Sequence, residues 1–178
     1  NGAGFLPPWA STIGPAAPGA RSPYRTTLLD FVRRFAITDA RMTICQGLID
    51  YRDELRQMGV KGFQWLDGSF VEDVENFRPS KPRPADIDVV TFADFGLQHD
   101  AQLTLLGTRA KQRYCVDGYF VSLHMPPDEL VERTAYWFGL FGHRRTDAAW
   151  KGMVQVELGT SDQDAVQHLQ ALQHTGTP

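Results

Sequence analysis

The sequence predicts one domain of the α+β class. Apolar residues recur at spacings of three and four over residues 39–58, which is the period of an amphipathic helix. Over residues 153–158 they alternate with polar residues, which is the period of a half-buried strand. Both patterns occur within 178 residues, a length that fits one domain with a sizeable core. We therefore expect helices and strands to share one core.

The N-terminal segment, residues 1–26, is expected to be a proline- and glycine-rich arm. Five prolines lie between Pro7 and Pro23, and the segment has no hydrophobic period. Proline disrupts helices and central strands, so this arm should lie over the domain surface. Residues 27–158 are then expected to form the folded domain itself. The polar residues 159–178 form a tail that either frays or adds a short terminal helix.

Four helices are expected within the domain. The second is the strongest, and Gly59 is placed as its C-terminal stop. The fourth opens at Pro126, Pro127 and Asp128, where proline and acidic residues are favoured in the first turn, and it stops at Gly142. The four helices are expected over residues 27–35, 39–58, 100–111 and 126–141.

Four strands are expected in the same region. The run IDVVTF at residues 87–92 is rich in β-branched residues, which favour strands. The strand before it leads into Asp67, Gly68 and Ser69, and one turn of helix is expected over residues 70–74. The four strands are expected over residues 63–66, 87–92, 114–123 and 153–158.

Composition restricts the partners and the compartment. The net charge of −3 argues against a broad surface for duplex DNA, which is usually strongly basic, but it allows a local basic groove. No apolar stretch approaches the roughly 20 residues that cross a bilayer, and neither end shows a signal peptide. Cys45 and Cys115 lack the spacing of a zinc site and suit a reducing compartment. We expect a soluble, cytoplasmic protein with no membrane partner.

Three aspartates lie on or beside predicted strands. Asp86 and Asp88 are separated by one residue, so in a strand both side chains project from the same face. Two carboxylates this close repel each other unless a cation holds them, and Mg²⁺ or Mn²⁺ accepts such oxygens together with substrate phosphates. Asp117 interrupts the otherwise apolar strand CVDGYFV. It either faces solvent at a sheet edge or completes a three-acid metal site.

Gly68 and Ser69 precede these aspartates in the chain. The pair follows a strand, so its backbone N–H groups and the Ser69 hydroxyl could hold a phosphate, and glycine permits close approach. A Gly-Ser pair by itself is more often a simple turn. The interpretation of Gly68 and Ser69 as a phosphate-binding turn is favoured by the order of elements. A strand and the Gly-Ser turn are followed by a strand with Asp-x-Asp and then by a strand with a further Asp.

This order resembles the nucleotidyltransferase superfamily, typified by DNA polymerase beta and the minimal nucleotidyltransferases. A closer resemblance, to a group of short bacterial nucleotidyltransferase-like proteins, extends from Gly4 to about Leu158 and includes the Gly-x-Leu-Pro-Pro, GSF, DIDVV and Trp-Lys-Gly-Met runs. The spacer from Ser69 to Asp86 is longer than in minimal enzymes, and the Arg-Gly that commonly follows their Gly-Ser pair is absent. The residues that match the superfamily motif are Gly68, Ser69, Asp86, Asp88 and Asp117.

The resemblance implies a mixed β-sheet flanked by α-helices, the polymerase beta-like fold, and a centre with two Mg²⁺ or Mn²⁺ ions. It implies in-line transfer of a nucleoside monophosphate from a nucleoside triphosphate such as ATP, with release of pyrophosphate. Asp86 and Asp88 would bridge both ions. Asp117 would hold the catalytic ion and help to deprotonate the attacking hydroxyl.

Basic residues are candidates for contacts with the triphosphate. Most charges at helix ends or on strands are simply solvated, so only a few of the candidates should take part. Arg144 and Arg145 are the best pair. The five histidines lack metal-site spacing, which argues against zinc chemistry. The basic candidates are Lys111, Arg113, Arg144, Arg145 and Lys151.

The spacer over residues 71–85 contains the run PSKPRP. Long loops of this composition usually lie on the surface and often carry function. We therefore expect a mobile flap near the nucleotide entrance.

Two functions from different classes are compatible with these residues. The first is an enzyme that attaches a nucleotide to a protein or nucleic-acid hydroxyl, with protein or RNA as acceptor. By analogy alone, it would form one half of a bacterial toxin–antitoxin or defence pair with a partner protein from the same operon. The second is a regulatory or antitoxin-like module that keeps the nucleotide pocket but has little transferase activity, because no separate substrate-binding domain is visible.

Overall fold

The structure is a computed structural model that describes residues 4–9, 16–17, 19–78, 80, 82–94 and 100–175. Its strands are β1 (Tyr24–Thr26), β2 (Lys61–Asp67), β3 (Ile87–Asp94), β4 (Val116–Ser122) and β5 (Val154–Glu157). They form a five-stranded sheet in the order β1-β5-β2-β3-β4. β1 is parallel to β5 and β4 is parallel to β3, whereas β2 is antiparallel to both of its neighbours. The sheet is therefore mixed.

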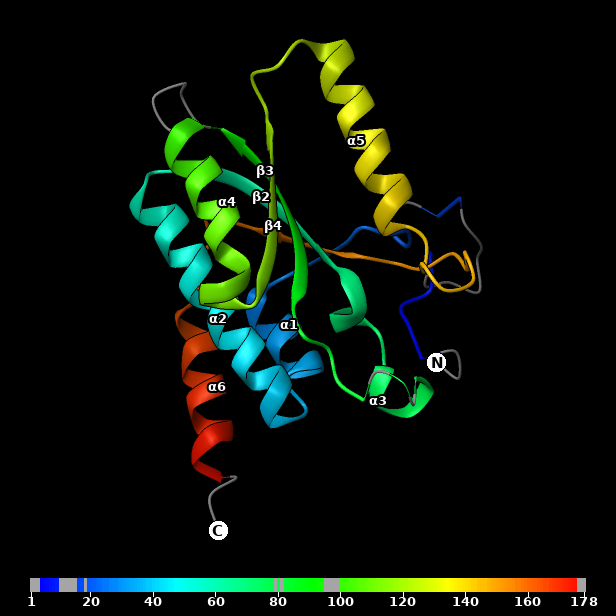
Figure 1. The fold of residues 1–178 in the computed structure, drawn as a ribbon, viewed down its shortest axis with the longest axis vertical. Coiled ribbons are helices and arrows are strands. Elements are labelled where there is room, and N and C mark those ends of the chain that lie inside the picture. The colour runs from blue at the N-terminus through cyan, green and yellow to red at the C-terminus, as the bar shows by residue number, and fades with distance from the viewer. Residues whose placement is uncertain are drawn as a thin grey trace.

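Six α-helices accompany the sheet in the described part of the chain. They are α1 (Leu28–Phe35), α2 (Asp39–Gln57), α3 (Val74–Phe77), α4 (Asp100–Tyr114), α5 (Pro127–Phe141) and α6 (Gln163–Thr175), and a 3₁₀ helix, η1 (Gly68–Val71), follows β2. Helices α1, α2, α4 and α6 cover one face of the sheet, and α5 stands over the other (Figure 1). The predicted α+β class, with a mixed sheet and flanking helices, is confirmed. Among the described residues, no helix combines the length and apolarity needed to cross a bilayer.

Alternation along the central strands separates two hydrophobic cores. On β2, Leu66 packs into the larger core under the four helices, whereas Trp65 belongs to the smaller core on the α5 face. Trp137 and Phe141 are the buried residues of α5. Because α5 buries so few side chains, this face is thinly covered. The pocket described below opens at its end.

Threonine side chains fix where α1 and α2 begin. The Thr27 hydroxyl accepts a hydrogen bond from the backbone N–H of Asp30 at 3.1 Å. The Thr38 hydroxyl accepts one from the backbone N–H of Arg41 at 3.3 Å. Each bond satisfies a donor that the first turn of a helix leaves free. Both helices therefore begin close to their predicted positions.

The two ends of the chain contribute to the fold. Strand β1 pairs with β5 at the edge of the sheet, so the sheet begins before residue 27. The polar residues after 158 include α6, which buries Ala165 and Leu169 in the larger core. Of the two alternatives for the tail, the structure contains the helix.

The boundary between α4 and β4 differs from the prediction. Helix α4 continues through Tyr114, whereas the sequence predicts that the strand begins there. Cys115 then adopts a left-handed conformation with φ of 55°, which ends the helix and turns the chain into β4. The prediction failed because the apolar run is continuous across this junction, so periodicity gives no boundary.

The prediction of a mobile flap over residues 71–85 is wrong for its first part. Val71 and Val74 are buried, with 2% and 1% of their surfaces exposed. Val71 packs in the larger core. At this point the segment is therefore a fixed wall of the domain. Exposed loop residues were expected here, but the apolar side chains are buried instead. Residues 79 and 81 of the proline-rich run lie outside the described residues.

Candidate active site

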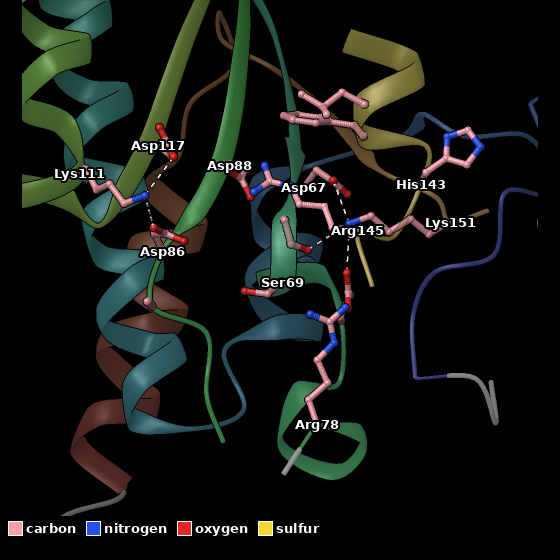
Figure 2. A pocket seen from close by; sticks show the side chains of 15 residues that line it. Asp67, Ser69, Arg78, Asp86, Asp88, Lys111, Asp117, His143, Arg145 and Lys151 are labelled. Atoms are coloured by element: carbon pink, nitrogen blue, oxygen red, sulfur yellow. Dashed lines mark hydrogen bonds and ion pairs between the residues drawn. The ribbon is translucent and has the colours of Figure 1, made fainter. Parts of the chain in front are cut away.

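Aspartates from three adjacent strands lie side by side at one end of the sheet. Asp67 on β2 is the register partner of Asp88 on β3, and Asp88 is the register partner of Asp117 on β4. Asp86 immediately precedes β3 and lies beside them (Figure 2). All four line a pocket of about 270 Å³ on the α5 face. The sheet register therefore gathers four carboxylates that come from separate parts of the chain.

Lys111 lies between two of these carboxylates. Its ammonium nitrogen is 2.8 Å from Asp86 Oδ2 and 3.0 Å from Asp117 Oδ2 (Figure 2). The lysine comes from the last turn of α4. These contacts raise the pKa of Lys111 above its ordinary value, because both carboxylates stabilise the charged amine.

Asp88 lies where a negative charge is disfavoured. Burial raises its pKa, and repulsion from Asp86 and Asp117 raises it further. Arg145 and Lys151 act in the opposite direction but do not cancel these effects. A cation placed against Asp88 would therefore relieve an electrostatic cost that the protein alone leaves in place.

Lys151 is a buried cation at the back of the pocket. Its ammonium is 2.9 Å from Asp67 Oδ2 and 3.3 Å from Glu72 Oε1. It also donates to the backbone oxygen of Gly68 at 3.3 Å. Burial nevertheless raises the pKa of Asp67 to about 7, against the attraction of Lys151. Lys151 is thus held by three groups, the carboxylates of Asp67 and Glu72 and the backbone oxygen of Gly68.

Glycine is required at position 68. Its φ of +82° is in the left-handed region, and a Cβ at this position would overlap the Asp88 carboxylate. The next residue, Ser69, has a buried hydroxyl that finds no hydrogen-bond partner among the described residues. A buried hydroxyl without a partner can gain a hydrogen bond when a ligand binds, and Ser69 lines the pocket.

Arg41 on α2 positions the turn that carries Ser69. Its guanidinium donates to the backbone oxygens of Phe70 and Glu72, each at 2.6 Å. It also forms an ion pair with Glu75 at 2.6 Å. Arg41 is only 1% exposed, so its bonds to the two backbone oxygens form away from water. This buried arginine therefore holds the turn and the pocket wall in place.

The pocket contains oxygen donors of the kind that divalent cations bind. The carboxylates repel one another, Lys111 already serves as a shared cation for two of them, and the Ser69 hydroxyl and Asp67 Oδ1 are buried without partners in the described ranges. Hard oxygen donors of this kind are those that Mg²⁺ and Mn²⁺ prefer. A ready-made cage is not present: within the described ranges, no three His, Cys, Asp or Glu side chains form a group that could hold a metal ion.

Comparison with known proteins places the chain in a family. Residues 1–157 match DUF6932, which is described as a family of unknown function. The chain belongs to this family. No curated protein and no solved structure matches it. The chemistry of the pocket in this DUF6932 protein must therefore be argued from its residues.

The structure sorts the predicted basic residues of this DUF6932 chain. Arg145 and Lys151 line the pocket, as does Lys111. Arg144 does not, because its guanidinium pairs with Asp147 and lies over the ring of Phe5. Arg113, also outside the pocket, forms an ion pair with Glu54. The predicted pair Arg144 and Arg145 is therefore divided in the structure, because these neighbouring residues point to different places and only Arg145 lines the pocket.

Three charged residues of the pocket were not predicted from the sequence. Asp67 could have been found, because it lies two residues after Trp65 on the same strand and so shares its face, directly before the Gly-Ser turn. Glu72 and Arg78 carry no such signal. They form an ion pair of 2.6 Å in the wall that the sequence had predicted to be a flap.

Proposed function

We propose that this chain is a metal-dependent nucleotidyltransferase that transfers a nucleoside monophosphate from a nucleoside triphosphate to a hydroxyl of a protein or nucleic acid. The observation that carries the proposal is the register of β3 and β4, which sets Asp88 beside Asp117. Asp86 and the buried Ser69 hydroxyl lie in the same pocket. The finer fold assignment, to the polymerase beta-like fold, belongs to this proposal. The order of β2, Gly-Ser turn, β3 and β4 supports it.

The residues of the pocket would divide the work as follows. Ser69 would donate its hydroxyl hydrogen to a phosphate oxygen, which would satisfy a buried group that has no partner in the part of the chain that the structure describes. Arg145 is exposed at the pocket and would meet the negative charge of the triphosphate. Asp117, with 30% of its side chain exposed, would accept the proton of the attacking hydroxyl.

Asp86 and Asp88 would hold Mg²⁺ or Mn²⁺ together with Asp117. When bound, such ions supply neutralisation of the charge on the transferring phosphoryl group and on pyrophosphate. Asp88 would gain from such an ion, because burial and the like charges of Asp86 and Asp117 oppose its ionised form. Lys151 and Arg41 would position the turn and the wall rather than contact substrate, because both are buried among protein partners.

A second function is favoured by one observation. Lys111 already bridges Asp86 and Asp117, which is compatible with a regulatory or antitoxin-like module that binds nucleotide but has little transferase activity. In that case the lysine would remain in place of a metal ion. The two functions differ in whether labelled nucleotide reaches an acceptor.

The experiment incubates the purified protein with labelled nucleoside triphosphates, Mg²⁺ or Mn²⁺, and a panel of protein and RNA acceptors. We expect transfer of label by the wild type and none by the double variant Asp86→Ala with Asp88→Ala. Asp94→Ala is the matched control, because Asp94 ends the same strand and is 55% exposed away from the pocket lining. This control should retain activity.

Binding should be measured beside transfer. Nucleotide binding without labelling of any acceptor would favour the regulatory module. Failure to bind both nucleotide and divalent metal would contradict both functions. Labelling that persists in the double variant would contradict the assignment of the site.

A further inference from the structure

Lys111 and Lys151 are two lysines of one pocket with opposite mobility. Lys151 is 4% exposed and is held by Asp67, Glu72 and a backbone oxygen. The Lys111 side chain is 57% exposed, although it reaches Asp86 and Asp117 at hydrogen-bond distances. A lysine side chain has a flexible stem of four carbons, so an exposed lysine can leave its partners while the aspartates stay fixed by the sheet. Of these two lysines, Lys111 is therefore the one that can move.

A metal ion and the Lys111 ammonium would compete for the same oxygens. Mg²⁺ lies about 2.0–2.1 Å from its oxygen ligands. The ammonium lies 2.8 Å from Asp86 Oδ2 and 3.0 Å from Asp117 Oδ2. An ion bound to these atoms would be in close contact with the ammonium, and both carry positive charge. Only one of the two cations can occupy the position between the carboxylates.

We propose that Lys111 is a resident counter-ion of the carboxylate centre, and that a divalent cation binds only by displacing it. This inference rests on the proposed metal-dependent function. Lys111 neutralises part of the repulsion among Asp86, Asp88 and Asp117 while no metal is bound. Metal binding and release of Lys111 are then one coupled event. If the Lys111 charge weakens metal binding by a given factor, removal of that charge must strengthen metal binding by the same factor.

Calorimetric titration with Mn²⁺ tests this coupling in the full-length protein without nucleotide. The variant Lys111→Met removes the charge but keeps the length and helix propensity of the side chain. We expect its dissociation constant for Mn²⁺ to fall roughly tenfold or more relative to wild type. Lys111→Arg keeps a cation beside the carboxylates and should show no such tightening. Lys61→Met removes another exposed lysine, at the start of β2, and should bind Mn²⁺ like the wild type.

Thermal unfolding gives a readout that does not depend on activity. At one Mn²⁺ concentration, the midpoint temperature of Lys111→Met should rise more than that of wild type, because tighter binding to the folded state stabilises it more. Without metal, Lys111→Met should be no more stable than wild type, since it leaves the carboxylates uncompensated. The side chain is exposed enough that the fold should tolerate both substitutions at this position.

The outcomes separate this inference from the proposed function. Equal Mn²⁺ affinity in wild type and Lys111→Met would overturn the displacement mechanism but leave a metal-dependent function standing. Mn²⁺ binding by Lys111→Met, but not by the wild type, would support displacement. Absence of Mn²⁺ binding in every variant would overturn both, because no metal site would then exist. Tightening by Lys111→Arg as large as that by Lys111→Met would overturn the role of charge.

Discussion

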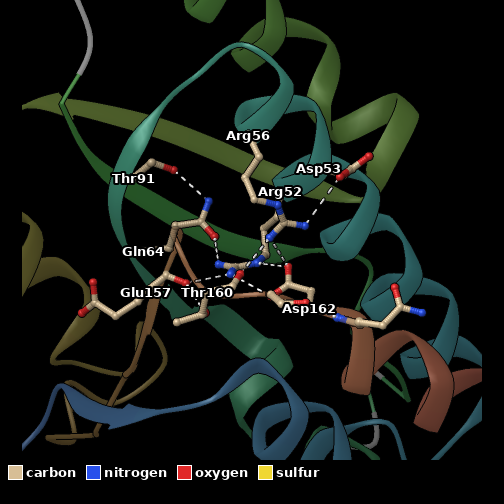
Figure 3. Close-up of polar contacts among 10 residues, drawn as sticks. Arg52, Asp53, Arg56, Gln64, Thr91, Glu157, Thr160 and Asp162 are labelled. Carbon is tan, nitrogen blue, oxygen red and sulfur yellow. Dashed lines mark hydrogen bonds and ion pairs between the residues drawn. The ribbon is translucent and has the colours of Figure 1, made fainter.

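Each face of the sheet carries a cluster of charged residues, and the two clusters differ in how fully their polar groups are paired. On the face under α2, Arg52 is fully buried and donates to Asp162 at 2.7 and 3.0 Å (Figure 3). It also donates to the side-chain oxygen of Gln64 at 2.7 Å and the backbone oxygen of Glu157 at 2.8 Å. Gln64 in turn donates to Thr91 at 3.0 Å. The central cation of this network, the Arg52 guanidinium, therefore has hydrogen-bond partners on every side.

The pocket on the α5 face is incomplete by comparison. Asp67 Oδ1 and the Ser69 hydroxyl are buried without partners among the described residues. Asp88 faces like charges from Asp86 and Asp117. Both clusters are built on β2 and β3, on residues that alternate between the two faces. The same two strands therefore support one network whose charges are paired by the protein and one in which like charges face each other.

This difference teaches how to tell a structural charge cluster from a functional one. A buried charge with all its partners contributes to a unique fold and has nothing left to offer a ligand. A cluster with unpaired donors and mutual repulsion gains free energy when a ligand binds. Removing a charge should therefore have opposite effects on stability at the two sites.

The largest effect is expected in the Arg52 network. Asp162→Ala leaves the Arg52 guanidinium buried without its carboxylate, and breaking such a pair costs about 3–5 kcal/mol. Urea denaturation monitored by tryptophan fluorescence measures the free energy of unfolding. Asp53→Ala is the control, because Asp53 is 57% exposed and its pair with Arg56 is 3.7 Å long. A loss at Asp162 no larger than at Asp53 would remove the contrast between the faces.

The next effect tests the geometry of the pocket without changing a charge. Gly68→Ala requires an alanine in the left-handed region, which costs about 1–2 kcal/mol, and adds a Cβ against the Asp88 carboxylate. Gly59→Ala has the same backbone cost at φ of +77° but meets nothing within 4 Å. We expect Gly68→Ala to lose about 1–3 kcal/mol more than this control in urea denaturation, because the added methyl overpacks the site. Equal losses would show that the Asp88 contact is unimportant.

A third prediction concerns the ion pair that holds the pocket wall. Glu75→Gln removes the charge that faces buried Arg41 and should cost about 1.5–3 kcal/mol at pH 7, as expected for a charged hydrogen bond. The Arg41 hydrogen bonds lower the pKa of Glu75 from its ordinary value of 4.5. The pair therefore stabilises the fold above about pH 4.5, and this contribution disappears as the pH falls through the lowered pKa.

Urea denaturation of wild type and Glu75→Gln at pH 7 and pH 3 checks this sign. The gap between the two proteins should narrow at the lower pH. A gap that widens on acidification would show that the pair does not stabilise the folded state through the ionised carboxylate.

The smallest effect is expected at Asp88, and it has the opposite sign. Because its pKa is raised by burial and by like charges, the ionised carboxylate destabilises the fold at neutral pH. Asp88→Asn should leave the free energy of unfolding unchanged or raise it by up to about 1 kcal/mol, while it removes the proposed activity. Asp94→Asn, at the exposed end of β3, should stay within about 0.5 kcal/mol of wild type. A clear loss of stability at Asp88 would identify it as a structural carboxylate.

Local periodicity was sufficient to predict most of the elements. The helix of residues 39–58 and the strand of residues 87–92 could be predicted because helix and strand periods are properties of contiguous residues. The edge strand at Tyr24–Thr26 could not, since three residues in a proline-rich arm carry no period. Its pairing with β5 depends on a contact about 130 residues away, between Tyr24 and Val154.

The candidate site divides in the same way. The sequence by itself predicted that Asp86 and Asp88 point to one place, because side chains two residues apart in extended chain project together, and both line the pocket. Only the tertiary structure decided that Asp117 lies beside Asp88, that Lys111 sits between Asp86 and Asp117, and that Lys151 is buried against Asp67. Strand register and helix packing set these distances. They arise from the packing of the whole core, which no local pattern of residues encodes.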